Sequence, residues 1–383
     1  MSGRPNVAVK IAFVSTILHY PWGGADKLWT RAAERAAADG HSLLLAISAA
    51  TAAHARIRAL GQQGARINLR RDFTLLNDAK KRWLERFRQA IGSSASLIVE
   101  LSRFRPDFVY INQGGTFDFQ VEPGLVAWLR KTSTPFAFIC QANRADTQLD
   151  PPTAATSREV LGLARSIFFV STHNLRLAER QIGAHLPLAR IVQNPVEIPL
   201  HPLPWPTADS VRFAVVARLE RHDKGLDLLI PALAAALGSD RDWHVAFFGR
   251  GPDEPFLRAL AATHGIADRI SFPGFQSDVR AVWQEHHLLL LPSRHEGCSL
   301  AMLEALACGR PVLATAVGGV SDWIVAGENG FVCDETDVAA LTSTLRRAWS
   351  LRATWPQLGI GAAHTAARLD PAPERTLLAA LSA

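Results

Sequence analysis

Four charged side chains in the second half of the sequence have the types and spacing needed to bind and cleave a phosphorylated sugar. Arg218 and Lys224 stand in one short polar stretch, and Glu296 and Glu304 stand in another. An arginine fork and a lysine point charge together suit a diphosphate, while carboxylates accept hydrogen bonds from sugar or ribose hydroxyls. When a sugar–phosphate bond breaks, negative charge grows on the departing phosphate. The two cations would therefore act mainly in the transition state.

The stretch that carries the two glutamates has the form of a loop that enters a helix. Gly297 allows a turn, and the helix is expected to begin near Ser299. Unpaired amides at that start, at Ser299 and Leu300, would be ready for a phosphate. Glu296 precedes the helix and Glu304 lies about one and a half turns inside it. Alone, Glu304 would be a solvated helix position, but its neighbours are mostly apolar, and a carboxylate buried among them needs a partner.

The cations flank a loop of their own, and glycines extend the expected donor site. For the loop taken alone, a surface ion pair with Glu220 or Asp223 is the competing interpretation. Gly23 and Gly24 follow the first expected strand, so their amides could approach a phosphate, and Gly249 follows another strand. No G-x-G-x-x-G or G-x-x-x-x-G-K-S/T motif is present, which disfavours NAD and ATP.

The elements that must position these residues alternate between strands and helices. Strands are expected at Val7–Ser15, Ser42–Ile47, Phe108–Asn112, Phe136–Cys140 and Ser166–Val170, then at Val211–Val216, Trp243–Phe248, Ile270–Phe272, His287–Leu291 and Pro311–Ala314. Helices include Ala25–Ala38, Val121–Lys131, Leu226–Leu237, Pro255–His264 and Leu300–Cys308. This alternation predicts an α/β protein with parallel, doubly wound sheets, in which ligands bind beyond the carboxyl ends of the strands.

The chain is expected to form two such domains. Five prolines between Pro195 and Pro206 indicate an extended linker. We therefore predict an N-terminal domain over residues 1–198, a proline-rich linker over 199–208 and a second domain over 209–365. Residues 366–383 form a helical tail that can pack back on the N-terminal domain.

Composition restricts the class of protein. Hydrophobic residues make up 48 % of the sequence and charged residues 20 %, as in globular proteins. No apolar run is long enough to span a bilayer, and the N-terminus does not resemble a signal peptide, so a cytoplasmic protein is expected. The four cysteines have no paired spacing and are interpreted as reduced, buried thiols.

The net charge of +6 is unevenly distributed. Residues 1–200 hold 25 Lys and Arg against 15 Asp and Glu, whereas the remainder holds 16 against 20. Around Lys80–Arg88, helical spacing gives one apolar and one basic face. Such a helix packs its apolar stripe on its own domain, or lies on the inner face of an anionic membrane as a peripheral contact. Nucleic acid is disfavoured because no binding motif accompanies the charge.

At these residues the sequence resembles the retaining glycosyltransferases of family 4. Arg218-Leu219 and Lys224-Gly225 are similar to the family's R-L-x-x-x-K-G segment with one extra residue, and Glu296 and Glu304 form its E-x7-E motif. A third match in register runs from Gly309-Arg310-Pro311-Val312 through Gly318-Gly319 to Gly327-Glu328-Asn329-Gly330-Phe331. The resemblance covers most of residues 211–347 and extends more faintly over the first half.

The resemblance implies a GT-B fold, in which two Rossmann-like domains face a central cleft. It implies that Arg218 and Lys224 bind the donor diphosphate and that Glu296 contacts hydroxyls of the transferred sugar. Glu304 would contact the ribose, and Gly24 would reach the phosphate from the N-terminal domain. Members of the family generally need no metal. Asp240-Arg241-Asp242, the one D-x-D spacing, precedes a strand and so lies at the wrong end of the sheet.

The acceptor side differs from the family pattern. Many members have a histidine after the strand that here ends at Cys140, whereas this chain has Gln141-Ala142-Asn143. Contacts there would be made by amides, and Gln141, Asn143 and Asn112 are the candidates. Asp322 also stands where the family usually has a glutamate.

The sequence therefore predicts a metal-independent retaining glycosyltransferase without a cofactor. Its donor would be a UDP- or GDP-sugar as co-substrate, and its acceptor a saccharide or lipid-linked hydroxyl in polysaccharide or glycolipid biosynthesis. A catalytically silent nucleotide-sugar-binding scaffold and a phosphorylase-type enzyme of the same fold are the two alternatives.

Overall fold

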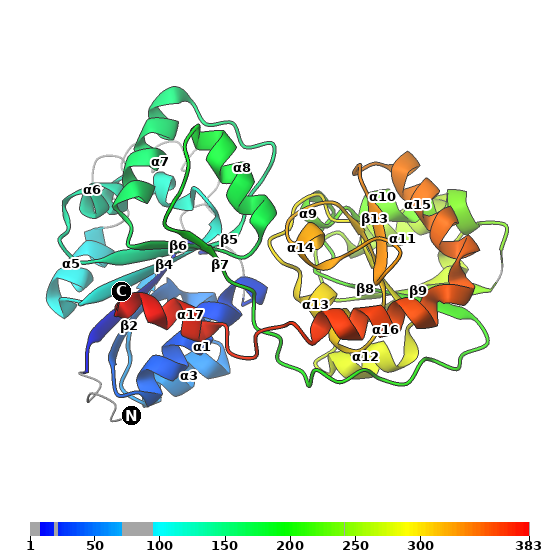
Figure 1. Cartoon of the computed structure of the whole chain (residues 1–383), viewed down its shortest axis with the longest axis horizontal. Helices are drawn as coiled ribbons and strands as arrows, with labels where there is room; N and C mark the ends of the chain where they lie inside the picture. Colours follow the sequence, from blue (N-terminus) through cyan, green and yellow to red (C-terminus); the bar gives the residue numbers. More distant parts are fainter. Residues whose placement is uncertain (1–7, 19–21, 71–94, 241, 383) are drawn as a thin grey trace. The chain divides into compact units, whose positions relative to one another are not determined.

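The computed structural model describes residues 8–18, 22–70, 95–240 and 242–382. The chain divides into two compact units, each with its own hydrophobic core (Figure 1). Unit 1 comprises Met1–Pro195 and Ala372–Ala383, and unit 2 comprises Val196–Pro371. The sequence placed the corresponding boundaries at residues 198 and 366. Lys80–Arg88, the proposed basic helix, lies outside the described residues.

Unit 1 is built on a seven-stranded parallel sheet with the order β3-β2-β1-β4-β5-β6-β7. Its strands are β1 (Lys10–Ser15), β2 (Ser42–Ser48), β3 (Arg66–Arg70), β4 (Phe108–Gly115), β5 (Phe136–Ala142), β6 (Ser166–Phe169) and β7 (Ala189–Ile191). Strands β2 and β3 are added on one side of β1, whereas β5, β6 and β7 are added on the other side, beyond β4. The order in which strands are added therefore reverses between the neighbours β1 and β4. That reversal is the switch point at which doubly wound sheets bind ligands.

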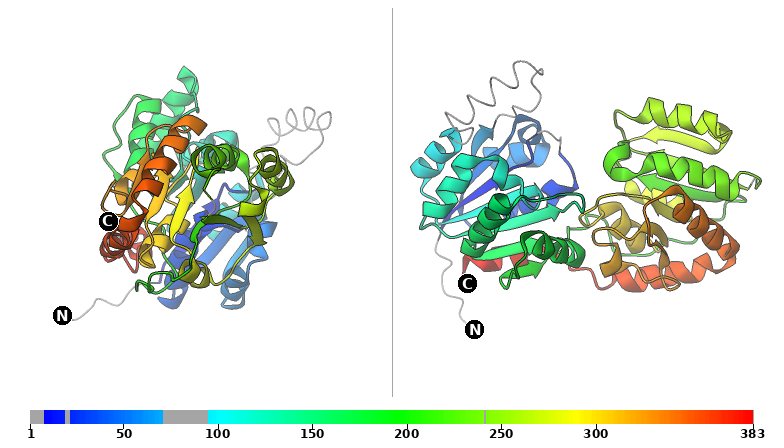
Figure 2. Two further views of the ribbon diagram at one scale, coloured as in Figure 1. Left: turned by 90° about the vertical axis from the view of Figure 1, so that its right-hand side faces the viewer. Right: turned by 90° about the horizontal axis from the view of Figure 1, so that it is seen from above.

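Helices cover both faces of this sheet (Figures 1 and 2). They are α1 (Gly24–Ala38), α2 (Ala49–Ala52), α3 (Ala55–Gln62), α5 (Ala95–Phe104), η1 (Asp118–Val121), α6 (Pro123–Lys131), α7 (Pro151–Leu163), α8 (Thr172–Ile182), α17 (Glu374–Leu378) and η4 (Ala379–Leu381). The C-terminal α17 packs beside α1, where Glu374 pairs with Arg31 at 3.1 Å. The Tyr110 hydroxyl also donates to the Leu377 carbonyl at 2.6 Å. These contacts attach the end of the chain to unit 1.

Unit 2 contains a six-stranded parallel sheet with the order β10-β9-β8-β11-β12-β13. Its strands are β8 (Val211–Val216), β9 (Trp243–Phe248), β10 (Ile270–Gly274), β11 (Leu288–Leu291), β12 (Val312–Thr315) and β13 (Gly330–Cys333). The strands are short and almost wholly apolar because helices bury both faces. The order reverses between β8 and β11, which makes this the switch point of the second sheet.

The helices of unit 2 form two layers around the sheet, with α10, α11 and α15 on one side and α12, α13 and α16 on the other (Figure 1). They are α9 (Arg221–Lys224), α10 (Leu226–Leu237), α11 (Glu254–Thr263), η2 (Ala267–Arg269), α12 (Val279–Glu285), α13 (Leu300–Ala307), α14 (Val320–Trp323), α15 (Val338–Ser350), η3 (Arg352–Thr354) and α16 (Trp355–Ala366). The proline-rich stretch before β8 has no regular structure. Arg310, buried at 1 % exposure, holds it by donating to the carbonyls of Leu203 and Pro204.

The expected strands and helices are all present, with shifts at their ends. Three further strands were missed in the sequence: β3, β7 and β13. Residues of β3 and β7 are largely exposed because both are edge strands, and their short polar sequences lack an apolar run. The helix expected at Val121–Lys131 begins only at Pro123, whose fixed φ suits the first helical position. Residues 118–121 instead form η1.

Candidate functional site

The loops that follow β8 and β11 carry three of the four charged residues singled out in the sequence. β8 and β11 are neighbours, and the chain leaves them in opposite directions across the sheet. Arg218 and Lys224 follow β8, and Glu296 follows β11. The switch point of unit 2 therefore brings together residues that are more than seventy positions apart.

Lys224 and Glu296 form an ion pair at the centre of this region. Lys224 Nζ lies 2.6 Å from Glu296 Oε1, which also accepts a hydrogen bond from Ser293 Oγ at 2.9 Å. The Glu296 side chain is 9 % exposed and that of Lys224 is 19 % exposed, so both reach solvent only at an edge. A partly accessible ammonium group beside a carboxylate can serve an anion and a hydroxyl at adjacent positions.

A second arginine, which the sequence did not single out, fastens the two loops to each other. Arg294 makes a two-pronged contact with Asp227, at 2.7 and 2.9 Å, and also donates to the Arg221 carbonyl. The amides of Arg294 and His295 donate to the Asp223 carbonyl at 2.7 and 3.1 Å. Burial opposes ionisation of Asp227, but the hydrogen bonds and charge of Arg294 outweigh it and lower the pKa of Asp227. Asp227 therefore stays ionised and keeps this clamp intact at neutral pH.

Two glycines permit the close approach of the loops. Gly225 has φ +62°, and a Cβ there would lie 2.0 Å from the Pro292 carbonyl oxygen. Gly318, after β12, has φ +55°, and a Cβ there would lie 2.5 Å from the carbonyl oxygens of Glu296 and Gly297. Both positions need a left-handed backbone and lack space for a side chain. The backbone that carries Glu296 is thus enclosed by glycines on two sides.

The helix expected after Glu296 is α13, and its start is well defined. Ser299 caps it by accepting a hydrogen bond from the Met302 amide at 3.4 Å, and Leu300 is its first residue. Glu304 lies inside α13 and is 9 % exposed, with apolar neighbours on the same helix. The predicted positions of Gly297, Ser299, Leu300 and Glu304 relative to Glu296 therefore hold along one continuous loop and helix.

Arg218 lies beside the loop that follows β9. Its side chain is exposed, and its neighbour Leu219 donates an amide hydrogen bond to the Arg250 carbonyl at 3.0 Å. Gly249 has φ +139°, and a Cβ there would lie 1.8 Å from the Ala217 carbonyl oxygen. Gly249 is thus adjacent to the Arg218 loop, and its role there is to let two strand-end loops touch.

In unit 1, Gly23 and Gly24 mark the start of α1, as expected, but an acidic residue shares this position. Asp26 Oδ2 accepts from the Gly23 amide at 3.0 Å, and Asp26 Oδ1 accepts from Trp29 Nε1 at 3.2 Å. Burial raises the pKa of Asp26, while these hydrogen bonds oppose the rise. The Gly23 amide is therefore already engaged by a carboxylate, which the sequence analysis did not anticipate, and this leaves the Gly24 amide for any phosphate.

The candidate acceptor-side amides lie at the carboxyl ends of β4 and β5. Asn112 and Gln141 are 2 % and 5 % exposed, and Gln141 Nε2 donates to Asn112 Oδ1 at 3.3 Å. Within the described part of the chain, Asn112 Nδ2 and Gln141 Oε1 have no hydrogen-bond partner. Asn143 is separate from this pair, because its amide donates to Gln181 Oε1 at 2.8 Å. The structure thus couples Asn112 with Gln141 and directs Asn143 elsewhere.

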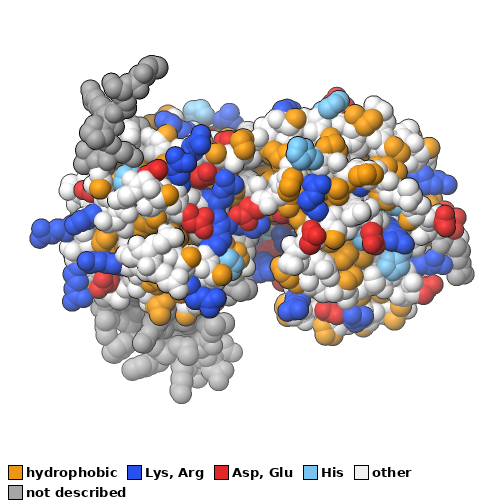
Figure 3. Space-filling model, turned by 90° about the horizontal axis from the view of Figure 1, so that it is seen from below, with side chains coloured by type: hydrophobic (Ala, Val, Ile, Leu, Met, Phe, Trp, Pro, Cys, Tyr) orange, Lys and Arg blue, Asp and Glu red, His pale blue; other side chains and the backbone are white. Residues whose placement is uncertain are grey.

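The described residues contain no group of three or more histidine, cysteine or acidic side chains arranged to hold a metal ion. Asp240, of the D-x-D stretch, accepts from Trp349 Nε1 at 2.9 Å before β9 begins. All four cysteines are free and buried. On the face displayed in Figure 3, Lys and Arg side chains are interspersed with Asp and Glu. Among the described helices, none is long and apolar enough to cross a bilayer.

The fold and the site define a tandem of two Rossmann-like units with a charged, strand-end site in the second. Residues 210–350 match the family model described as glycosyl transferases group 1. This segment contains Arg218, Lys224, Glu296 and Glu304, so the predicted site lies within the matched domain.

Curated relatives match about a third of the chain. The lipopolysaccharide core biosynthesis mannosyltransferase LpsB of Rhizobium meliloti (strain 1021) is 37 % identical over 128 residues, which cover 32 % of this chain and 36 % of that protein. LpcC of Rhizobium leguminosarum bv. viciae, with the same description, is 35 % identical over 130 residues, covering 33 % and 37 %. The chain thus spans little more than a third of the length of these relatives.

Solved structures match almost the whole chain. The Anabaena Alr3699/HepE protein in complex with UDP has a TM-score of 0.73 at 18 % identity, covering 97 % of this chain and 99 % of that one. At this identity the likeness concerns the fold. The chain therefore has the GT-B type of fold and contains a glycosyl transferases group 1 domain.

Proposed function

We propose that this protein is a retaining glycosyltransferase that moves a sugar from a UDP- or GDP-sugar to a hydroxyl acceptor. The observation that carries the proposal is the convergence of Lys224 and Glu296 at the switch point of unit 2. It is supported by the match of residues 210–350 to group 1 glycosyltransferases and by a structural neighbour solved with UDP. The lipopolysaccharide role of the relatives supports a saccharide or lipid-linked acceptor in polysaccharide or glycolipid biosynthesis.

The site residues fit a division of labour on a sugar nucleotide. Lys224 and Arg218 bind the diphosphate and neutralise the charge that develops as the sugar leaves. Glu296 accepts from hydroxyls of the transferred sugar, and Glu304 from the ribose. The amides at the start of α13 complete the phosphate contacts. The chemistry needs no cofactor and no metal in this scheme.

Retention of configuration follows from front-face substitution. The acceptor hydroxyl attacks the sugar carbon on the side from which the phosphate leaves. The carbon–oxygen bond to the phosphate breaks, a new bond to the acceptor oxygen forms, and a phosphate oxygen takes the hydroxyl proton. Lys224 is well suited to the step because an ammonium group stabilises the leaving diphosphate without itself being consumed.

Melting temperatures in the presence of sugar nucleotides test this function directly. A ligand that binds only the native state at about 100 times its Kd adds about 2.7 kcal/mol of stability. UDP- or GDP-sugars are therefore expected to raise the melting temperature by several degrees, and ADP-sugars at equal concentration by much less. Absence of a shift with every UDP- and GDP-sugar would contradict the proposal.

A second measurement separates the enzyme from its alternatives. Release of UDP or GDP from the stabilising donor, slowly without acceptor and rapidly with it, identifies a transferase. A silent scaffold would give the melting shift without nucleotide release. A phosphorylase-type enzyme would instead consume free phosphate or glycosyl phosphate and show no nucleotide dependence.

On the acceptor side, we propose that the Asn112–Gln141 pair receives a hydroxyl group. If the oxygen and nitrogen atoms of both side-chain amides were exchanged, Asn112 would donate to Gln141. One acceptor atom and one donor atom of the pair would still remain without a partner among the described residues. A group that both donates and accepts, such as an alcohol, is the complement of such a pair. The pair lies beside the switch point of unit 1, since Asn112 pairs with Ser15 at the end of β1.

Replacing Gln141 by leucine is expected to raise KM for the acceptor about tenfold, because one hydrogen bond to a hydroxyl is worth roughly 1 kcal/mol or more. The melting shift caused by the donor should not change. Gln120→Leu is the matched control, since the Gln120 side chain donates to Ser157 and to the Thr153 carbonyl in the described part of the chain. An unchanged acceptor KM in Gln141→Leu would remove the pair from the acceptor site and assign its free atoms to a buried water.

A further inference from the structure

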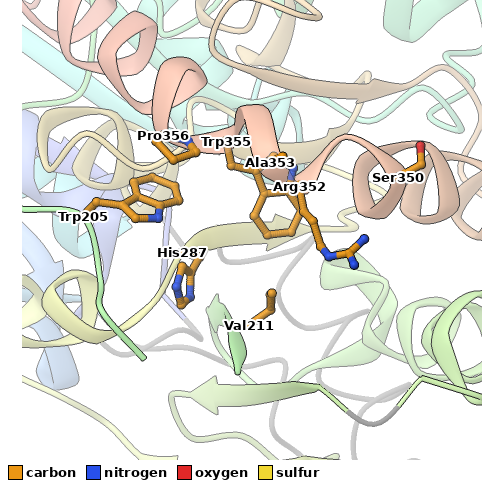
Figure 4. Close-up of a pocket in the computed structure, with 8 residues that line it drawn as sticks. All are labelled: Trp205, Val211, His287, Ser350, Arg352, Ala353, Trp355 and Pro356. Carbon is orange, nitrogen blue, oxygen red and sulfur yellow. The ribbon is translucent and has the colours of Figure 1, made fainter. Parts of the chain in front are cut away.

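Unit 2 has a hollow at the end of its sheet opposite to the end that carries Lys224 and Glu296. It has a volume of about 490 Å³, within the usual range for small-molecule sites (Figure 4). Val211 at the start of β8 and His287 just before β11 form one wall, and β8 separates this end from the other by about 20 Å. The remaining lining comes from the linker and from the segment between α15 and α16: Trp205, Ser350, Arg352, Ala353, Trp355 and Pro356.

The Trp205 indole and Pro356 give the hollow its apolar walls, whereas Trp355 is only 1 % exposed and lies behind its surface. Pro356 lies beside Trp205 (Figure 4). Trp355 is held in place because its Nε1 donates to the Ala348 carbonyl at 3.1 Å. Trp205 is only partly buried, and its ring meets His287 edge to face with 5.7 Å between the centroids. Flat apolar walls of this kind suit the C–H face of a ring-shaped ligand.

The polar groups that line the hollow donate hydrogen bonds. His287 Nδ1 accepts from the Arg212 amide at 3.0 Å, which leaves the proton of the neutral ring on Nε2. Burial lowers the pKa of His287 to about 4, so the ring is neutral at pH 7. His287 is 7 % exposed, and no described side chain or carbonyl accepts a hydrogen bond from Nε2. The His287 ring is one of the groups that line the hollow (Figure 4).

The second donor is a cation at the rim, Arg352. The Arg352 guanidinium stacks on Trp349 at 4.8 Å and donates one hydrogen bond, from Nη1 to the Trp349 carbonyl, so most of its N–H groups remain available. The side chain is exposed. No aspartate or glutamate is among the lining residues. The lining therefore combines a positive charge, a neutral donor and an apolar ring face, and none of its residues is acidic.

We propose that this hollow binds a carboxylate-bearing sugar ring, such as a uronic acid unit of a saccharide. The carboxylate complements the donors, because it accepts hydrogen bonds and carries the opposite charge, whereas a neutral hydroxyl matches them less well. The ring complements the Trp205 indole. The saccharide nature of the ligand rests on the proposed function. The carboxylate rests on the lining alone, and the site would hold a saccharide away from the reacting atoms.

Ligand-observed saturation-transfer NMR on the full chain tests the proposal. The probes are sodium glucuronate, glucose and sodium acetate, and the nucleotide-sugar melting shift is measured on the same samples. Glucuronate is expected to bind saturably with a Kd in the millimolar range, and glucose and acetate at least fivefold more weakly. UDP-sugar at saturation should not displace glucuronate, since the two sites lie at opposite ends of the sheet.

Three exposed substitutions sharpen the test. Arg352→Gln removes the rim cation and is expected to weaken glucuronate binding at least fivefold, and Ala353→Glu should abolish it by adding a negative charge at the rim. Arg368→Gln is the matched control, because Arg368 also stacks on an indole, that of Trp323 at 5.9 Å, outside the hollow. It should leave binding unchanged.

Either of two results overturns the proposal: equal affinity for glucuronate and one of the other probes, or glucuronate binding that survives both Arg352→Gln and Ala353→Glu. If glucuronate fails to bind while UDP- or GDP-sugars still raise the melting temperature, the hollow is refuted and the proposed function stands. If glucuronate binds while no UDP- or GDP-sugar raises the melting temperature, the proposed function is refuted and the hollow remains a binding site.

Discussion

Replacing Lys224 by methionine is expected to lower kcat by about 10²- to 10³-fold, with a smaller change in KM for the donor. The reason is that the ammonium group gains most of its interaction energy when charge develops on the leaving diphosphate. Methionine keeps the length and apolar part of the side chain and removes only the charge and its donors. The measurement is steady-state release of the nucleoside diphosphate, with the donor identified by the melting panel.

Replacing Lys224 also breaks its ion pair with Glu296, and this affects stability as well as turnover. Lys224→Met removes the counter-charge from the Glu296 carboxylate, which is 9 % exposed and also accepts a hydrogen bond from Ser293. Loss of this charged partner is expected to cost about 2 kcal/mol. The double variant Lys224→Met/Glu296→Gln relieves that cost because the neutral amide needs no counter-charge. We therefore expect the double variant to recover melting temperature but not turnover.

A matched control separates loss of this cation from loss of any surface cation. Arg258→Gln breaks a comparable pair in the same unit, with 2.8 Å between Arg258 Nη2 and Glu254 Oε1. Because this pair is exposed on α11, its loss should change stability by less than about 1 kcal/mol and leave kcat unchanged. Wild-type turnover in Lys224→Met, or recovery of turnover in the double variant, would exclude Lys224 from the chemistry.

The main features of unit 2 could be predicted from the sequence because they are encoded locally. Short apolar runs such as Val211–Val216 alternate with helices, and this pattern fixes parallel strands and the edge at which polar loops collect. Lys224 and Glu296 each follow such a strand, so their convergence follows from the topology alone. Ser299 was recognisable as a helix cap because its residue type suits that position.

The junction between the loops could not be predicted, because it depends on distances across the fold. Nothing in the neighbourhood of Arg294 indicates that its guanidinium reaches Asp227, 67 positions earlier. The contact between Asp26 and the Gly23 amide could not be predicted either. It competes with the phosphate-binding role that the sequence suggests for Gly23 and Gly24. Edge strands such as β3 were missed because an exposed strand has no continuous apolar pattern.

The contact between Gly225 and Pro292 makes the second large effect predictable. Gly225→Ala places a Cβ 2.0 Å from the Pro292 carbonyl oxygen, so the two loops must separate by more than about 1 Å to reach normal contact. That movement lengthens the hydrogen bonds from the amides of Arg294 and His295 to the Asp223 carbonyl. Since a displacement of about 1 Å can cost 10²-fold in rate, kcat/KM should fall by about that factor.

Gly265→Ala is a control that isolates the close contact from the backbone strain. Gly225 and Gly265 have φ values of +62° and +69°, so alanine suffers similar left-handed strain of about 1–2 kcal/mol at both. Of these two glycines, only Gly225 has another atom within 4 Å of the added Cβ. Gly225→Ala should therefore destabilise the protein by about 1–3 kcal/mol more than Gly265→Ala in urea unfolding.

Gly225→Ala and Gly265→Ala together test whether activity depends on the close contact between the loops that follow β8 and β11. Gly265→Ala is expected to keep full kcat/KM despite its lower stability, because Gly265 lies before β10 and far along the chain from Lys224 and Glu296. Asp227→Asn weakens the same junction without adding atoms, and should reduce kcat/KM in a fully folded protein. Equal activity in Gly225→Ala, Asp227→Asn and Gly265→Ala would mean that the spacing of Lys224 and Glu296 does not control the reaction.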